Sequence, residues 1–146
     1  MTFAFYELAI LIRARTGKVL DSLPRNETFN FVDLVSIELT TQMLATLFDF
    51  PFEERRKLTR WSDVSTALPK GGIVDSEEQR RAEMDECAAY FTKLWNERVN
   101  SEPRNDLLSM MAHSDATRYM DADNLMGNLI LLIVGGNDTT RNTMTG

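Results

Sequence analysis

Apolar residues recur along the chain at helical steps of three and four, and Pro and Gly fall between the periodic segments. The first segment keeps this spacing from Phe5 through Val19 to Leu23 and ends at Pro24. The second covers residues 31–50, and its apolar stripe is expected to be a buried helix face: Val32, Val35, Leu39, Met43 and Leu47. Because no segment shows the alternation of a strand, the sequence predicts an all-α fold.

Three further helices have recognisable start and stop signals. Pro51 can open a third helix because the N–H that proline lacks is not needed in a first turn. Its expected apolar side is Leu58, Trp61, Val64 and Leu68, and the residues Pro69-Lys70-Gly71-Gly72 are expected to end it in a loop. Asp75 and Glu78 form the predicted capping box of a fourth helix. The apolar positions of that helix are Met84, Cys87, Ala88, Phe91, Leu94, Trp95 and Val99, and a short helix is expected from Asp106 to His113.

The last helix is expected to begin at an Asp121 cap and to be buried on every side at Leu129-Ile130-Leu131-Leu132-Ile133-Val134. The run Gly135-Gly136-Asn137-Asp138-Thr139-Thr140 then interrupts it, although each glycine costs about 1 kcal/mol in a helix interior. Two interpretations stay open. Either the helix stops at Gly135 and a polar loop follows, or it continues to about Gly146 and is opened to admit a small molecule.

Helical spacing favours the second interpretation, because an apolar wall, bare backbone, an acid and an alcohol fall within about one face: Leu131, Val134, Gly135, Asp138 and Thr139. The run from Leu132 to Thr140 resembles the oxygen-binding helix of the cytochrome P450 family, whose motif is Ala/Gly-Gly-x-Asp/Glu-Thr-Thr/Ser. The preceding helices also follow that family's order from D to H. The resemblance implies a partial P450 fold with helices D, E, F, G, H and I. Residues 1–146 would then be a single internal fragment without the N-terminal sheet or the C-terminal haem-ligand region.

The resemblance also implies an activity. The parent enzyme would be a haem-dependent monooxygenase that inserts one atom of O2 into an aliphatic C–H bond, with electrons from a ferredoxin and an NAD(P)H-dependent ferredoxin reductase. Residues 31–51, 60–63 and 135–142 are similar to the bacterial alkane terminal hydroxylase subfamily, which implies a hydrophobic substrate such as a medium-chain alkane. A terpene, fatty acid or steroid stays open as the substrate.

The resemblance assigns roles residue by residue. Asp138 and Thr139 match the catalytic pair, an acid that passes protons and an alcohol beside the oxygen site. Gly135 and Gly136 match the cofactor and oxygen groove, and Leu131, Val134 and Gly135 match positions that touch substrate. The segment from Leu68 to Val74 matches the lid between helices F and G.

Other expected features of the family are missing. Nothing resembles the loop that carries the cysteine ligand of the haem, and Cys87 on an apolar helix face is expected to be a core residue. A lone His113 predicts a surface or capping role, and no metal cluster is expected. The fragment alone is therefore expected to be inactive. A helical small-molecule-binding or regulatory module without catalysis remains the alternative.

Composition and charge limit the classes of partner and the cellular location expected for the protein. The net charge of -6 is spread along the chain, which argues against nucleic acid as a partner. The single cysteine argues against a disulfide framework. Glu7 and Arg13 interrupt the apolar N-terminal stretch before it reaches the length of a membrane span. A cytoplasmic location is expected.

Overall fold

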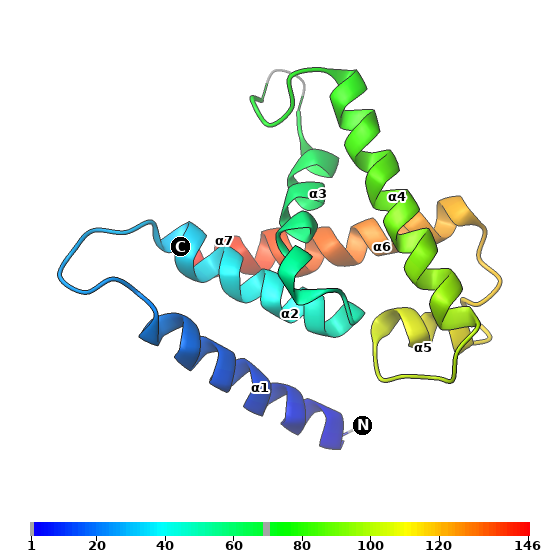
Figure 1. Cartoon of the computed structure of the whole chain (residues 1–146), viewed down its shortest axis with the longest axis horizontal. Coiled ribbons are helices and arrows are strands. Elements are labelled where there is room, and N and C mark those ends of the chain that lie inside the picture. Colours follow the sequence, from blue (N-terminus) through cyan, green and yellow to red (C-terminus); the bar gives the residue numbers. More distant parts are fainter. Residues whose placement is uncertain (1, 69–70) are drawn as a thin grey trace.

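The computed structural model describes residues 2–68 and 71–146, with side chains from Tyr6 onward. Every regular element in these ranges is helical, which confirms the predicted all-α class (Figure 1). In chain order the elements are α1 (Thr2–Asp21), η1 (Val32–Ile37), α2 (Glu38–Phe48), η2 (Phe52–Glu54), α3 (Arg56–Thr66), α4 (Glu77–Val99), α5 (Leu107–His113), α6 (Ala122–Val134), η3 (Gly135–Thr139) and α7 (Thr140–Thr145). The elements η1 and η3 are π-helical and η2 is a 3-10 turn.

The last helix, formed by α6, η3 and α7, runs through the middle of the molecule beside α2 (Figure 1). On one side α3 packs on α2, α6 and η3, and α4 covers α3 and extends down to α5. On the other side α1 lies against α2. The motif segment η3 is therefore held between α2 and α3.

Aromatic side chains fill the junction between α2, α3 and α4. They are Phe48, Phe50, Trp61, Tyr90 and Phe91. Phe48 meets Phe91 edge to face at 5.6 Å between ring centroids, and Phe50 stacks on Tyr90 at 4.9 Å. Each such pair adds about 0.5–1.5 kcal/mol beyond the buried area, so the cluster fixes α2 against α3 and α4.

The prediction of which face of the second segment is buried is largely wrong. Of the five predicted residues only Val35 is buried, and the others are half-buried. The fully covered side carries instead Ser36, Thr40, Thr41, Leu44, Ala45 and Phe48. The buried positions Ser36, Thr40, Leu44 and Phe48 continue at steps of four from η1 into α2, and α2 packs on α3 and η3. The predicted stripe faces a groove of about 360 Å³ between α1, α2 and α7, lined by Leu39, Met43 and Leu47.

The start of α4 differs from the prediction by one residue. Ser76, not Asp75, is the N-cap, and its hydroxyl accepts a hydrogen bond from the Gln79 backbone N–H at 3.1 Å. The Gln79 side chain accepts in return from the Asp75 N–H at 2.8 Å. The reciprocal pattern of a capping box is present, but serine and glutamine form it.

Two predicted apolar contacts are also wrong. Leu68 is 75% exposed because α3 ends at Thr66 and the next residue is extended. Val99 is exposed because Arg98 takes the buried position at the end of α4. Pro69 and Lys70, part of the predicted loop and lid, lie outside the described residues, and Gly72 follows with a positive φ of 74°.

The short helix α5 is confirmed, with an Asp106 carboxylate that caps it by accepting from the Ser109 N–H at 2.8 Å. His113 has the predicted capping role, because its ring nitrogens lie 2.8 Å from the Ser109 carbonyl and 3.1 Å from that of Ser101.

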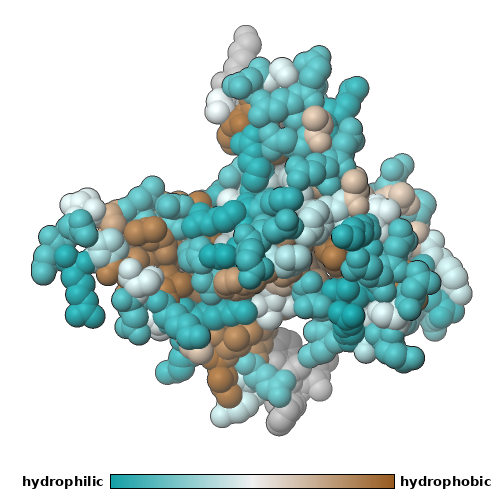
Figure 2. Space-filling view, in the orientation of Figure 1, coloured by the Kyte–Doolittle hydropathy of each residue, from teal (hydrophilic) through white to brown (hydrophobic). Residues whose placement is uncertain are grey.

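Helix α1 is sparsely covered along its described side chains. Of its described side chains Val19 is buried, whereas Ile10 and Leu20 are at least half exposed. Figure 2 shows apolar patches over the middle of α1 and around the beginning of α2. Across the described residues, no helix combines the length and hydropathy that a bilayer crossing would require.

Candidate functional site

The last helix does not stop at the two glycines. Asp121 caps it as predicted, with its carboxylate accepting from the Asn124 N–H at 2.8 Å. The helix then continues from α6 through the π-helical turn η3 into α7. Such π-turns are rare in helices as a whole, but those that occur are often found at functional sites. The unbroken but distorted helix is the outcome that separates the two interpretations of the motif, and it favours a site over a helix end.

Polar side chains hold the π-turn in place. The Thr139 hydroxyl donates to the Gly135 carbonyl at 2.6 Å, which satisfies an acceptor inside the distorted turn. Asn137 is fully buried, and its carbonyl oxygen accepts from the Thr40 hydroxyl of α2 at 3.0 Å. The distortion is therefore anchored to a neighbouring helix rather than left flexible.

The two glycines of the motif face different surroundings. A Cβ added at Gly136 would lie 2.7 Å from Cδ2 of Leu44 in α2, so the absence of a side chain there permits the close approach of the helices. A Cβ added at Gly135 would meet nothing within 4 Å. Of the two predicted cofactor residues, only Gly135 faces the open side of the helix.

That open side corrects the prediction that the last helix is buried all round. Leu131 is 71% exposed, Gly135 and Thr139 are exposed, and Leu132 is 40% exposed. The opposite side of the helix packs on α2 and α3 through buried Leu129 and Ile133. A contiguous strip of exposed apolar residues such as this one marks a candidate binding surface for a ligand or a partner.

Val134 and Asp138 lie beside this strip and are half-buried. The Asp138 carboxylate accepts a hydrogen bond from Arg141 of α7 at 2.5 Å. The same guanidinium donates to Asp63 of α3 at 3.1 Å. The acid and the alcohol of the motif are thus neighbours in sequence but bond to partners on different sides of the helix.

Sequence analysis missed Arg141, Asp63, Thr40 and Asn137 as members of the site. The spacing of Asp138 and Arg141 at i and i+3 is the one available signal, because residues so spaced meet on a helix. Nothing local to Asp63 or Thr40 could show that α3 and α2 bring them to η3.

Buried polar atoms also collect where α3 meets η3. Thr59 Oγ1 and Ser62 Oγ of α3, and Asn137 Nδ2 of η3, have no hydrogen-bond partner among the described residues. Buried polar groups are normally satisfied, so ordered water is the expected partner of these three atoms.

The open strip fits one face of a flat, apolar cofactor such as haem, because bare backbone at Gly135 and the Leu131 side chain leave it flat and hydrophobic. Cys87, the single cysteine of the sequence, is not placed to bind the iron of such a cofactor. It is fully buried in the core face of α4 and does not reach the open strip, and burial raises the pKa of its thiol to about 12. Within residues 2–68 and 71–146, no group of three or more His, Cys, Asp or Glu could hold a metal ion.

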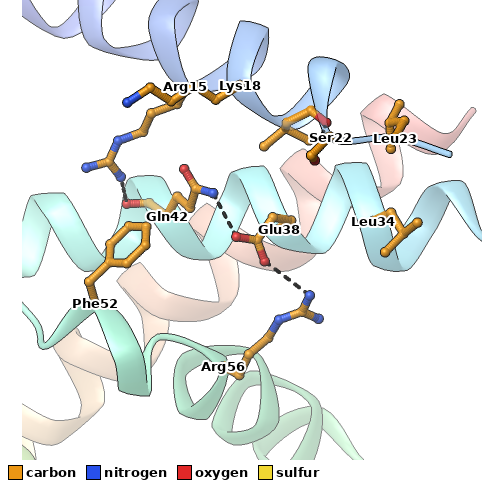
Figure 3. Close-up of a pocket in the computed structure, with 10 residues that line it drawn as sticks. Arg15, Lys18, Ser22, Leu23, Leu34, Glu38, Gln42, Phe52 and Arg56 are labelled. Atoms are coloured by element: carbon orange, nitrogen blue, oxygen red, sulfur yellow. Dashed lines mark hydrogen bonds and ion pairs between the residues drawn. The ribbon is translucent and has the colours of Figure 1, made fainter.

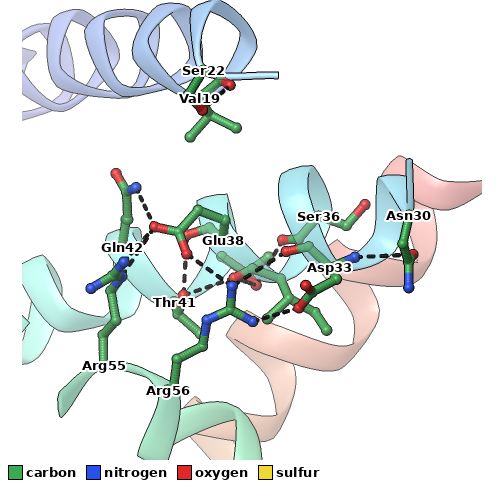
Figure 4. A network of polar contacts seen from close by, with 12 residues as sticks. Val19, Ser22, Asn30, Asp33, Ser36, Glu38, Thr41, Gln42, Arg55 and Arg56 are labelled. Atoms are coloured by element: carbon green, nitrogen blue, oxygen red, sulfur yellow. Dashed lines mark hydrogen bonds and ion pairs between the residues drawn. The ribbon is translucent and has the colours of Figure 1, made fainter. Parts of the chain in front are cut away.

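A larger cavity of about 530 Å³ lies between α1, α2 and η2, and none of its lining residues belongs to the motif. Figure 3 shows Arg15 and Lys18 of α1 above Glu38 and Gln42 of α2, with Phe52 and Arg56 on the far side. Glu38 is bound by Gln42, Arg55 and Arg56, as Figure 4 shows. Burial favours the neutral acid, but these partners outweigh it and hold the pKa of Glu38 below its usual range. These ion pairs and hydrogen bonds of Glu38 hold α2 against the start of α3, which is a structural role.

These features describe an all-helical chain with a candidate small-molecule site on a distorted helix. No family model matches the chain. It is 30% identical to the steroid C26-monooxygenase of Mycolicibacterium smegmatis, over 92% of this chain and 31% of that protein. It is 27% identical to cytochrome P450 109 of Bacillus spizizenii, over 95% of this chain and 35% of that protein.

Solved structures agree with these matches. The cytochrome P450-153 of Novosphingobium aromaticivorans has a TM-score of 0.84 and 48% identity, with 100% of this chain and 34% of that chain covered. CYP153D17 of Sphingomonas has a TM-score of 0.81 and 54% identity, with 99% and 36% covered. In sequence and in fold, the chain corresponds to about a third of a bacterial cytochrome P450, which confirms the predicted family and the partial helical fold.

Proposed function

We propose that this chain is the oxygen-activating part of a haem-thiolate monooxygenase that inserts one atom of O2 into an aliphatic C–H bond. The observation that carries the proposal is the open strip of the last helix, where Leu131, Gly135 and Thr139 face outward at a π-turn. The chain spans about a third of the length of the curated relatives it matches, so the activity is proposed for the protein that contains it.

When bound, the haem would supply the iron chemistry that activates O2. The residues of this chain provide the surface and the protons. Leu131 and Gly135 present an apolar face that excludes water from the cofactor edge. The Thr139 hydroxyl, held on the Gly135 carbonyl, can exchange that bond for a water and pass a proton at its oxygen. Asp138 supplies the acid next to it.

Medium-chain alkanes or related aliphatic chains are the proposed substrates. Leu131 and Val134 offer apolar contacts without a charged side chain between them, which suits a hydrocarbon. The similarity to the two P450-153 structures supports this choice. A steroid is the second candidate, because one relative is named a steroid C26-monooxygenase.

Electrons are proposed to come from a ferredoxin and its NAD(P)H-dependent reductase. The cytoplasmic location stays a prediction. The alternative of a regulatory module without catalysis is disfavoured because it required the last helix to end at Gly135, and that helix continues to Thr145.

The test is a carbon monoxide difference spectrum of the full-length reduced protein, followed by turnover of octane with a ferredoxin and its reductase. The proposal predicts a thiolate-type Soret band and octanol with the oxygen on the terminal carbon. The 146-residue chain alone, with Cys87 buried, should give no such band. A full-length protein that binds haem without a thiolate band would contradict the proposed chemistry.

A further inference from the structure

The cavity of about 530 Å³ between α1, α2 and η2 carries an excess of positive charge. Its lining contains three cationic side chains, those of Arg15, Lys18 and Arg56, and one carboxylate, that of Glu38. Two positive charges therefore remain on the walls of the cavity, although the whole chain has a net charge of -6. A local excess of one sign in a hollow of the surface attracts ions of the opposite sign.

Glu38 cannot neutralise the α1 side of the cavity, because partners in α2 and at the start of α3 already occupy both of its carboxylate oxygens (Figure 4). One oxygen accepts from the Gln42 amide and from Arg55, each at 2.7 Å, and the other accepts from Arg56 at 3.1 Å. The ion pairs around this cavity all involve Arg55 or Arg56. Among the side chains that the structure describes, the cations of α1 have no carboxylate partner.

Arg15 is held over the cavity by contacts that do not compensate its charge (Figure 3). Its guanidinium donates to the backbone carbonyl of Gln42 and lies 5.4 Å from the centre of the Phe52 ring. Arg55 lies 4.4 Å from the centre of the same ring, so two like charges share one aromatic side chain. Burial and, to a smaller extent, the charge of Arg55 lower the pKa of Arg15. A bound anion would offset the repulsion between the two guanidiniums.

The charge and the donor groups of the cavity fit a phosphate group. A phosphate monoester carries a charge of about -1.5 to -2 at pH 7, which matches the excess on the walls. A guanidinium has five N–H donors and an ammonium has three, so Arg15 and Lys18 together offer donors beyond the one that Gln42 accepts. The volume lies within the range of about 300–1,000 Å³ that is typical of small-molecule sites, which leaves room for the rest of a small ester.

We propose that this cavity binds the phosphate group of a small molecule, with Arg15 and Lys18 of α1 on one side and Arg56 of α3 on the other. Arg56 keeps its pairs with Asp33 and Glu38 and contributes its charge. None of the lining residues belongs to the glycine motif, so the site is separate from the proposed oxygen-activating face. Because α1 is sparsely covered, a phosphate that joins its cations to Arg56 also holds α1 against the rest of the chain.

The test is isothermal titration of inorganic phosphate into the full-length protein near neutral pH and at constant ionic strength, with acetate as the singly charged reference. Phosphate should bind with one-to-one saturation, and about tenfold more tightly than acetate, because two wall charges face it. Arg15→Gln and Lys18→Gln should each weaken phosphate binding about three- to tenfold. Arg15→Lys should lose less affinity than Arg15→Gln, since it keeps the charge.

Arg13→Gln is the matched control, because Arg13 is an exposed cation of the same helix that does not line the cavity. It should leave the phosphate affinity unchanged. Equal losses in Arg13→Gln and Arg15→Gln would show a response to net charge alone and would overturn the site. Acetate binding as tight as that of phosphate, or the absence of saturable phosphate binding, would overturn it as well.

Hydrogen exchange of the full-length protein gives a second readout, which locates the effect of the anion. At a phosphate concentration ten times the Kd, backbone exchange in α1 should slow by up to about tenfold, while α5, which does not line the cavity, should be unaffected. At the same concentration the slowing in Arg15→Gln should be only about two- to fourfold. Equal slowing of α1 and α5 would indicate a general salt effect and contradict the proposal.

Discussion

Alanine substitution of the two motif glycines should have opposite effects on stability, although they are adjacent. Gly135 has α-helical dihedrals of -61° and -40°, and a Cβ there would meet nothing within 4 Å. Gly135→Ala should therefore stabilise the chain by up to about 1 kcal/mol, the helix propensity difference between the two residues.

At Gly136 there is no such open space for an added Cβ. That Cβ would lie 2.7 Å from a terminal methyl of Leu44, so the methyl must move by about 0.7 Å to reach an ordinary van der Waals contact. Leu44 is 3% exposed and belongs to the hydrophobic core with Phe48, Leu129 and Ile133, but Leu44 and Gly136 also line the groove of about 360 Å³ beside α1, so movement of the methyl toward that groove sets the lower end of the cost. Overpacking of this kind costs about 1–3 kcal/mol, which equals or exceeds the gain in helix propensity.

The difference between the two variants should be about 1–3 kcal/mol in the free energy of unfolding, with Gly135→Ala the more stable. Thermal unfolding followed by far-ultraviolet circular dichroism measures it, and the melting temperatures should differ by roughly 2–12 °C. Gly136→Ser tests the steric cause, because it adds the same Cβ and should be destabilised at least as much. A Gly136→Ala variant as stable as Gly135→Ala would refute the close approach of α2 and η3.

Three further predictions concern other parts of the chain. Ser76→Ala should cost about 1 kcal/mol in urea unfolding because it removes the N-cap of α4, whereas Asp75→Ala should cost clearly less, since only the Asp75 backbone N–H is used. Arg98→Met should cost about 3–5 kcal/mol because it leaves buried Asp106 without its charged partner, whereas Arg118→Met on the surface should change the unfolding free energy by less than about 1 kcal/mol. Burial raises the pKa of Cys87 to about 12, so the unfolded chain loses the thiol proton at a lower pH than the folded chain does. Stability should therefore fall as the pH rises through the alkaline range, and Cys87→Ala should remove part of that fall; an identical pH profile would contradict it.

Features of local origin could be predicted from the sequence. The helix order, the cap at Asp121 and the burial of Cys87 depend on neighbouring residues or on periodicity, and all are confirmed. The position of the α4 cap was wrong by one residue because aspartate and serine are both good caps and stand side by side.

Features that depend on distant residues could not be predicted. The covered side of α2 depends on its packing against α3 and η3, which the spacing of apolar residues does not report. The candidate site shows the same limit, because the motif supplies Gly135, Asp138 and Thr139, while Leu44 gives Gly136 a packing role. The Asp138 carboxylate pairs with Arg141, and the contact of Arg141 with Asp63 exists only after α3 has packed on the helix.

The most direct test of the central claim, that the open side of the last helix is the oxygen-activating face, is the Thr139→Ala variant of the full-length protein. Electrons consumed from NAD(P)H are divided between hydroxylated octane and hydrogen peroxide, and both products are measured in one reaction. Loss of the hydroxyl that bonds to Gly135 should shift the electrons toward peroxide while the carbon monoxide difference band is retained. Unchanged coupling of NAD(P)H to octanol would contradict the account, because Thr139 would then have no part in proton delivery.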